Sequence, residues 1–503
     1  METSVAYVLG KHPVQTEGKE PMAFREASIG EEGPAMGVVR ALAASKVFRM
    51  TLMGICVMLV GLTAMKGVAL ADPDRTGATL LEEDPNLAVN FAWTLIAAFL
   101  VFFMQAGFAL LEAGSVRARS VSNVLTKNVV DFLMCGMAFW AFGFAIMFGG
   151  SAFTSGLDDG NKIFGSSGWF LAGDAYDVNT FKLWFFQMVF AATAATIVSG
   201  TMAERTKINA YMAYSFLISA IIYPVYGHWI WGGGWLASMA TPAWDFAGSG
   251  VVHTVGGTAA LVGGLMVGPR LGKFGPDGKP RSIPGHSVTL VVLGMMILFL
   301  GWFGFNPGST LAATELRISV IAVNTFLAGV AGGLAAYYIR FIETGKVDIA
   351  ATCSGIIGGL VAITAPCAFV ESWAAVVIGG VAGPIVVYGA RFLESVVKLD
   401  DPVWAVPCHM FSGLWGVLAV GIFADGTYLG VSGLIDGNSS QIVSQLISMV
   451  AVVSWTAITS ALIFGGIKMT MGLRVSHEDE IAGVDASEHT QIAYPADEPV
   501  MVT

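Results

Sequence analysis

Two histidines occupy matching positions in two similar stretches of the chain. Residues 245–257 read DFAGSGVVHTVGG and residues 401–413 read DPVWAVPCHMFSG, so each stretch has an Asp, seven residues, a His, three residues and a Gly. A neutral imidazole carries one donor and one acceptor nitrogen, so two neighbouring rings can pass a proton between them. His253 and His409 are therefore the first candidates for chemistry, and that chemistry is proton handling.

The elements that position these histidines are predicted to lie in a lipid bilayer. The sequence of 503 residues is 55% apolar and 12% charged, whereas a soluble domain has roughly 25% charged residues. Backbone groups in hydrocarbon must be paired within the protein, so the long apolar runs predict helices. The net charge of −10 comes mainly from the chain ends and outer loops, and we expect no nucleic-acid partner.

Apolar runs predict eleven spanning helices, so the fold class is an all-α polytopic membrane protein. The histidine stretches begin the fifth and tenth predicted spans, which run in opposite directions. This is expected if the first five and the next five spans form an inverted repeat, which would place both rings at one depth with substrate at the repeat interface. The predicted spans are residues 87–113, 123–149, 181–202, 208–231, 248–268, 285–306, 318–342, 348–368, 372–392, 404–424 and 442–470.

Lysines and arginines predict the orientation of these spans. Basic residues concentrate in cytoplasmic loops, and one set of alternate loops carries most of those found between spans. The N-terminus is thus predicted outside and the C-terminus inside, in a multi-pass protein of a bacterial inner membrane. The inner loops carry Arg117, Arg119, Arg205, Lys207, Arg270, Lys273, Lys279, Arg281, Arg340, Lys346, Arg391 and Lys398, and the outer loops carry Lys162, Lys182 and Arg317.

The N-terminal segment has the three-part pattern of a secretory signal peptide over residues 36–71. Basic residues precede an apolar run, and the small residues Ala69 and Ala71 follow it, which predicts cleavage after Ala71. An uncleaved first helix is the alternative. Residues 1–35 are expected to be a disordered extension or a mis-assigned start, and residues 84–472 and 473–503 a transport domain and a cytoplasmic tail.

Burial in a membrane makes an imidazole costly to charge, so both paired rings are expected to be neutral. A lone histidine is more simply explained as a hydrogen-bonding partner of a neighbouring helix, but matched positions favour a pathway. Haem ligation by His253 and His409 is the alternative from another class of protein. We predict no cofactor, no metal and no catalytic residue of an enzyme. His228 and His286, outside the repeat, are expected to play ordinary roles.

Aromatic residues near three span ends form a second group of candidates. Phe186 and Phe190 lie one helical turn apart in the third span. Trp231, at the end of the fourth, could hold a small cation against its ring, an interaction worth roughly 0.5 to 2 kcal/mol. The Ser309 hydroxyl, after the sixth span, could accept a hydrogen bond from the same cation. Taken singly, interface anchoring and packing explain these residues equally well.

Several long motifs resemble the ammonium transporter (Amt/Mep/Rh) family over about residues 85–480. They are WGGGWLAS, DFAGSGVVHTVGGTAALVGG, GPRLGKFGPDGKP, GWFGFNPGS and DDPVWAVPCHMFSGLWG. The resemblance implies transport of ammonium or methylammonium by a homotrimer with one pore per subunit. It also implies an outer ammonium site at Phe190, Trp231 and Ser309 above a gate of Phe190 and Phe305. Trp231 and Phe190 favour the Amt branch over the Rh branch.

The same resemblance implies that His253 and His409 line an apolar conduction path. Ammonium would lose its proton at the outer site and cross as ammonia, while the histidines relay the proton. Asp245 resembles the family's buried aspartate, and capping the fifth helix is its simplest role. Phe186, Trp302 and Asn306 are implied as supporting residues.

Two positions depart from common family patterns, because Met410 follows the second histidine and Trp404 replaces an acidic residue of some bacterial members. The tail resembles a segment that contacts a PII-type regulator, and a solvated acidic tail is the alternative. An ammonium sensor and a Rh-like gas channel also remain, although no signalling domain is expected after the last span.

Overall fold

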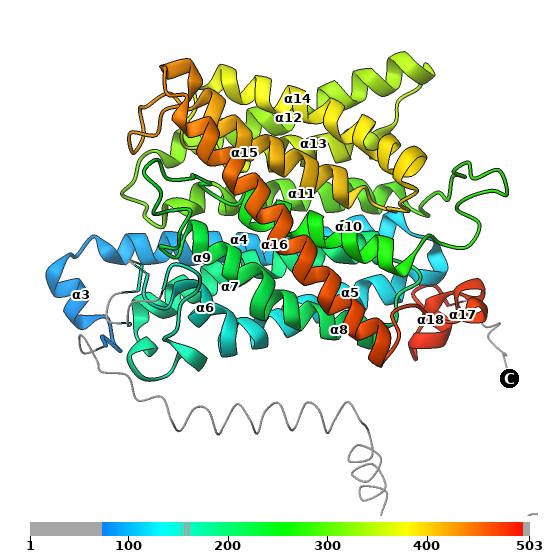
Figure 1. Cartoon of the computed structure of the whole chain (residues 1–503), viewed down its shortest axis with the longest axis horizontal. Helices are drawn as coiled ribbons and strands as arrows, with labels where there is room; N and C mark the ends of the chain where they lie inside the picture. The colour runs from blue at the N-terminus through cyan, green and yellow to red at the C-terminus, as the bar shows by residue number, and fades with distance from the viewer. Residues whose placement is uncertain (1–72, 152, 155–156, 158–160, 496–503) are drawn as a thin grey trace, which may run out of the picture. The chain divides into compact units, whose positions relative to one another are not determined.

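The computed structural model describes residues 73–151, 153–154, 157 and 161–495. These residues form helices and connecting loops, with isolated β-bridges but no β-strand among them (Figure 1). The predicted signal peptide and N-terminal extension lie outside the described residues. The α-helices are α3 (Ala78–Glu83), α4 (Leu87–Ser115), α5 (Val121–Ala138), α6 (Phe144–Phe148), α7 (Val178–Met202), α8 (Ile208–Leu217), α9 (Tyr223–Ile230), α10 (Val255–Val267), α11 (Val288–Phe305), α12 (Ile318–Thr344), α13 (Ile349–Thr364), α14 (Ser372–Phe392), α15 (Ser412–Phe423), α16 (Ser440–Thr470), α17 (His477–Ala482) and α18 (Val484–Glu488).

Short π-helical and 3₁₀ segments join several of these into longer helices. In the described part of the chain, ten continuous helices are long and apolar enough to cross a membrane, and each coincides with a predicted span. Two π-helical segments contain the paired histidines: η6 (Ser249–Thr254) precedes α10, and η9 (Val406–Phe411) precedes α15. A third, η8 (Leu393–Val397), follows α14.

The eighth predicted span is shorter than expected. Residues 348–368 were predicted to cross, but α13 is helical only over Ile349–Thr364, which is 16 residues. Pro366 explains the early end, because proline lacks the N–H that would continue the helical ladder. The freed carbonyls of Thr364 and Ala365 instead accept backbone hydrogen bonds from residues 246–247, at 3.1 Å each.

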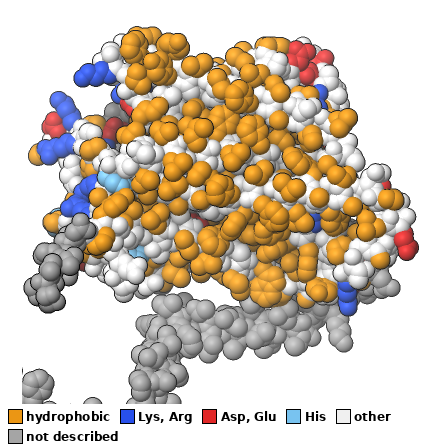
Figure 2. Space-filling view, turned by 180° about the vertical axis from the view of Figure 1, so that it is seen from behind, with side chains coloured by type: hydrophobic (Ala, Val, Ile, Leu, Met, Phe, Trp, Pro, Cys, Tyr) orange, Lys and Arg blue, Asp and Glu red, His pale blue; other side chains and the backbone are white. Residues whose placement is uncertain are grey.

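The outer surface has the composition expected of a protein in lipid. Figure 2 shows hydrophobic side chains across the middle of one face, while most charged side chains lie towards its two sides. Exposed apolar residues recur along the long helices, as at Phe99 and Phe103 of α4 and Val450 and Leu462 of α16. Since hydrocarbon contacts favour such side chains, the surface fits a bilayer.

The C-terminal segment is packed against the helices rather than free in solvent. Asp485 accepts hydrogen bonds from backbone N–H groups in the first turn of α5, and Glu488 accepts one from the start of α8. Glu480 accepts one from the loop after α10, and both Glu480 and Asp485 are 2% exposed. The alternative of a solvated tail is therefore wrong for residues 473–488, while most residues from 490 to 495 are exposed.

Buried ion pairs tie together the loops at the end of the bundle where α7 and α10 finish. Arg270 donates to both carboxylate oxygens of Asp400, at 2.8 and 2.9 Å, and to Glu204 at 2.5 Å. Burial by itself raises the pKa of Asp400, but hydrogen bonds from Arg270 and the charge of Arg205 outweigh it and hold that pKa well below its usual range.

We expect Asp400→Asn to destabilise the protein by about 3 kcal/mol, because it removes one of the two carboxylates that pair with the buried Arg270 guanidinium. The depressed pKa of Asp400 stabilises the folded state above the unfolded pKa of about 3.9, and this stabilisation is lost as pH falls from about 4 towards the lower pKa of the folded state. The melting temperature of detergent-solubilised wild type should therefore fall more steeply between about pH 5 and pH 2 than that of the variant. Parallel pH profiles would contradict this assignment.

Candidate functional site

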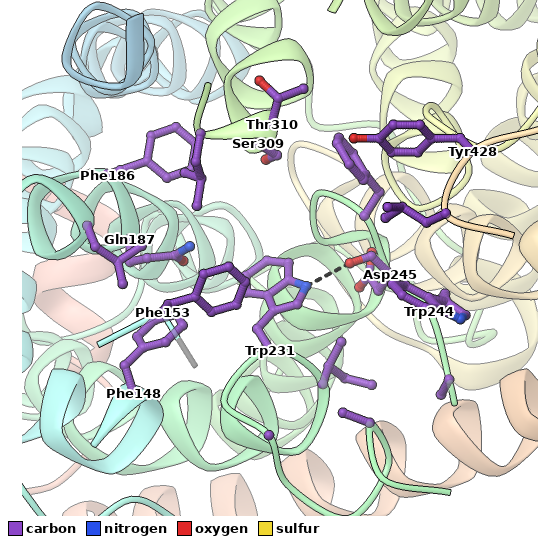
Figure 3. Close-up of a pocket in the computed structure, with 18 residues that line it drawn as sticks. Phe148, Phe153, Phe186, Gln187, Trp231, Trp244, Asp245, Ser309, Thr310 and Tyr428 are labelled. Atoms are coloured by element: carbon purple, nitrogen blue, oxygen red, sulfur yellow. Dashed lines mark hydrogen bonds between the residues drawn. The ribbon is translucent and has the colours of Figure 1, made fainter. Parts of the chain in front are cut away.

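A cavity of about 410 Å³ lies where the fourth, fifth and sixth predicted spans meet the third (Figure 3). Trp231 and Ser309, two of the three residues predicted to bind substrate, line it together with Phe186 and Asp245. Phe190, the third, is fully buried, and its ring centroid lies 6.3 Å from that of Trp231. The structure thus brings the three predicted residues together from α7, the end of α9 and the segment after α11.

Trp231 is held in place by the chain that leads to the fifth span. Its indole N–H donates a hydrogen bond of 2.7 Å to the backbone carbonyl of Asp245, drawn as a dashed line in Figure 3. This bond uses the N–H at the edge of the indole and leaves its π faces without a hydrogen bond from the same group. The geometry therefore fixes an aromatic face on the cavity wall.

The Asp245 carboxylate caps the helix that carries His253. Its Oδ1 accepts hydrogen bonds from the N–H groups of Gly248 and Ser249, and its Oδ2 from those of Gly250 and Val251, at 2.8 to 3.0 Å. Gly248 allows the turn, because its φ of +115° is a conformation that residues with a Cβ rarely adopt. The capping role expected for Asp245 is thus present.

A series of aromatic rings leads inward from the cavity. The rings of Phe190 and Phe305 stack with centroids 4.0 Å apart, and Phe186 lies 4.7 Å from Phe190. Phe305 is in turn 5.4 Å from the His253 ring. Both Phe190 and Phe305 have no exposed surface, so they separate the cavity from the histidines.

His253 and His409 meet in the interior. Their Nδ1 atoms are 3.2 Å apart and their ring centroids 5.2 Å apart. A hydrogen bond between two Nδ1 atoms needs a proton on one of them, so in the neutral pair the other ring carries its proton on Nε2. The two rings can therefore share a proton. Phe108 of α4 lies 6.2 Å beyond the His409 ring.

Local structure on both sides brings the two rings together. Both histidines lie in π-helical segments, η6 and η9, a feature that often occurs at functional sites. The glycine four residues after each histidine packs against the other stretch. A Cβ on Gly257 would come within 2.3 Å of the Met410 backbone, and one on Gly413 within 2.5 Å of the Ser249 carbonyl. Met410 thus provides a backbone contact at this crossing.

The end of α13 supports this site, which the sequence did not predict. Trp302 stacks on His253 at 5.3 Å, and its indole N–H donates to the Thr364 hydroxyl at 2.9 Å. Ser249 donates to the carbonyl of Val361 and accepts from the N–H of Ala365, at 2.7 Å each. Pro366, two residues after the end of α13 at Thr364, was the available signal.

The remaining candidates lie further from the cavity. Asn306 is buried and donates to Thr325 of α12 at 3.0 Å, and Trp404 has a φ of +58° in the turn before η9. His228 bonds two backbone carbonyls, and His286 bonds a carbonyl and the Tyr494 hydroxyl, which are ordinary roles. Within the described residues, no group of three or more His, Cys, Asp or Glu could hold a metal ion.

The fold and the site define a class of protein, a multi-pass helical membrane protein in which aromatic rings and a histidine pair follow a cavity at one end of the bundle. The sequence model that describes the Ammonium Transporter Family matches residues 92–494 of the chain. The chain belongs to this family.

Individual relatives agree with this assignment. Ammonium transporter Amt2 of Archaeoglobus fulgidus is 52% identical over 444 residues, which are 85% of this chain and 93% of that protein. Ammonium transporter 1 member 3 of Solanum lycopersicum is 37% identical over 440 residues, 81% of this chain and 94% of that protein. Among solved structures, a Sensor Amt Protein matches with a TM-score of 0.75 and 35% identity, covering 81% of this chain and 99% of its own. Mep2 of Candida albicans matches with a TM-score of 0.70 and 27% identity, covering 78% and 87%.

We expect Asp245→Asn to destabilise the protein more than the matched change Asp401→Asn. An amide at position 245 presents an NH₂ group to two buried backbone N–H groups, which costs about 3 kcal/mol. Asp401 makes fewer such bonds, accepting from the Val406 N–H at 2.8 Å and from the Thr201 hydroxyl at 3.3 Å. Thermal unfolding in detergent measures both, and equal losses would show that the four bonds of Asp245 carry no special weight.

Proposed function

We propose that this protein moves ammonium across a bacterial inner membrane by binding it in the outer cavity, removing its proton and conducting ammonia past the histidine pair. The observation that carries the proposal is the continuous order of cavity, stacked phenyl rings and facing imidazoles. We infer the substrate from relatives that are named as ammonium transporters and that match this chain over most of their own length.

Trp231, Phe190 and Ser309 form the outer site in this mechanism. The Ser309 hydroxyl donates to the Phe305 carbonyl at 2.8 Å, so its lone pairs are left to accept a hydrogen bond from the cation. The Trp231 ring adds a cation–π contact, worth roughly 0.5 to 2 kcal/mol. These contacts would hold a small cation in the cavity by neutral groups alone, without a negatively charged side chain.

Phe190 and Phe305 form the gate, and His253 with His409 lines the path below it. A cation between buried rings loses its hydration, so an ion that can give up a proton has an advantage over potassium. The ammonia then passes as a neutral molecule. The proton crosses through the shared Nδ1 contact, which makes net transport electrogenic. Phe186, Trp302 and Asn306 position these groups, and Asp245 holds the outer site to the histidine helix.

The proposed oligomer and topology are those that the resemblance to the family implies. We propose a homotrimer with one pore per subunit, an inverted repeat of the first five and next five spans, and a C-terminus in the cytoplasm. The paired use of π-helical segments around His253 and His409, each preceded by a capping aspartate, supports the repeat.

A second candidate is an ammonium sensor, which the likeness to the Sensor Amt Protein favours. A sensor would bind ammonium without a transport current. A Rh-like gas channel would conduct without net charge, and Trp231 and Phe190 at the mouth argue against it. Haem ligation fits poorly, since a metal between the two Nδ1 atoms, at about 2.0 Å from each, needs more room than the 3.2 Å that separates them.

Ammonium pulses on protein reconstituted on a solid-supported membrane test the proposal. Wild type should give an ammonium-dependent current. His253→Ala and His409→Ala should lower it by about 100-fold, the contribution of a positioned acid–base group. His286→Ala is the matched control and should keep the current. If wild type binds ammonium but gives no current, the transporter proposal is overturned and the sensor becomes the favoured function.

The packed tail is the proposed contact for a PII-type regulatory protein. The helices α17 and α18 present exposed residues such as Ile481, while the buried Asp485 and the half-buried Glu488 bond the starts of α5 and α8. We expect the regulator to co-purify with wild type after a nitrogen shock and to be lost when residues 473–503 are deleted. Unchanged recovery with the deletion would remove the tail from this role.

A further inference from the structure

Gln187 is a polar residue of the outer cavity to which the proposed mechanism assigns no role. It lies on α7 between Phe186 and Phe190, lines the cavity with Trp231 and Ser309, and is only 7% exposed. Its Oε1 has no hydrogen-bond partner in the described part of the chain. Figure 3 shows its amide directed from the Phe186 side of the cavity towards Trp231. A buried acceptor without a partner costs free energy unless a ligand supplies the donor.

Two other polar side chains of the cavity, Asp245 and Thr310, are already engaged. Both carboxylate oxygens of Asp245 accept two backbone N–H groups each. The Thr310 hydroxyl contacts the carbonyls of Pro307 and Ala312 and the Trp93 indole N–H. Among these four side chains, acceptor capacity remains at the Ser309 hydroxyl and at Gln187.

We propose that the Gln187 Oε1 accepts an N–H hydrogen bond from ammonium in the outer site and sets the preference for ammonium over its methylated analogue. Ammonium has four N–H donors arranged as a tetrahedron. The Trp231 ring, the Ser309 hydroxyl and the Gln187 carbonyl can receive three of them. Methylammonium has three N–H donors, so it can meet all three acceptors only when its methyl group points in the fourth direction. This restriction on its orientation means that it gains less from the Gln187 oxygen than ammonium does. The inference rests on the proposed outer site and adds to it a hydrogen-bond acceptor, the Gln187 Oε1, that orients the bound ammonium.

Gln187→Leu tests the proposal because leucine keeps most of the volume and removes the acceptor. We expect the half-saturating concentration for ammonium to rise about tenfold, the value of a hydrogen bond to a charged group. The value for methylammonium should rise about twofold, so the preference between the two ions narrows. Gln187→Glu keeps an acceptor oxygen and should restore tight ammonium binding.

Gln105→Leu is the matched control. Gln105 of α4 is also a buried amide with an unpartnered Oε1, at 8% exposure, but it does not line the cavity. Its substitution should leave both half-saturating concentrations unchanged. An equal shift in this control, or an unchanged ion preference in Gln187→Leu, would overturn the role of Gln187.

Binding and transport are measured separately so that the two proposals can fail separately. The rise in melting temperature with ammonium chloride or methylammonium chloride, against sodium chloride, reports binding, and the solid-supported current reports transport. Wild type that binds without current overturns transport, while the ion preference of the variants still decides the role of Gln187. Wild type that neither binds nor conducts overturns both.

Discussion

The bonding of Asp245 is the constraint on which the rest of the site depends. Four backbone N–H groups at the start of η6 converge on one buried carboxylate, and the backbone carbonyl of the same residue holds the Trp231 indole. Because unpaired backbone groups are costly in an apolar interior, this arrangement permits little movement. One residue thereby couples the wall of the outer cavity to the helix that carries His253.

Close backbone approach explains why the two histidines meet. Imidazole rings on helices separated by ordinary side chains would lie too far apart to share a proton, since packed helix axes are typically 8–10 Å apart. Gly257 and Gly413 remove the side chains at the two crossing points, and the π-helical segments turn the rings towards each other. The short α13 then braces both Ser249 and Trp302, so the pair is held from three sides.

The sequence predicted the parts of this structure that follow from periodicity and matching motifs. Ten long helices, the pairing of His253 with His409 and the grouping of Trp231 with Ser309 follow from apolar runs, a repeated spacing and the family motifs. The bonds of Thr364 and Ala365 across the bundle were not predictable, because their partners are more than 60 residues away along the chain. The docked tail was missed for the same reason, since acidic composition alone resembles a solvated segment.

The charge of the side chains that line the cavity bears on how it could release a bound cation. Asp245 is the one acidic side chain among the described residues that line it, and its oxygens are saturated by backbone N–H groups. A free carboxylate would form a charge-assisted bond to ammonium and favour the protonated form. In the proposed mechanism, the neutral acceptors Ser309 and Gln187 would hold the cation through directional hydrogen bonds and not through an opposite charge. They would therefore favour the protonated form less than a carboxylate would, as the proposed release of ammonia requires.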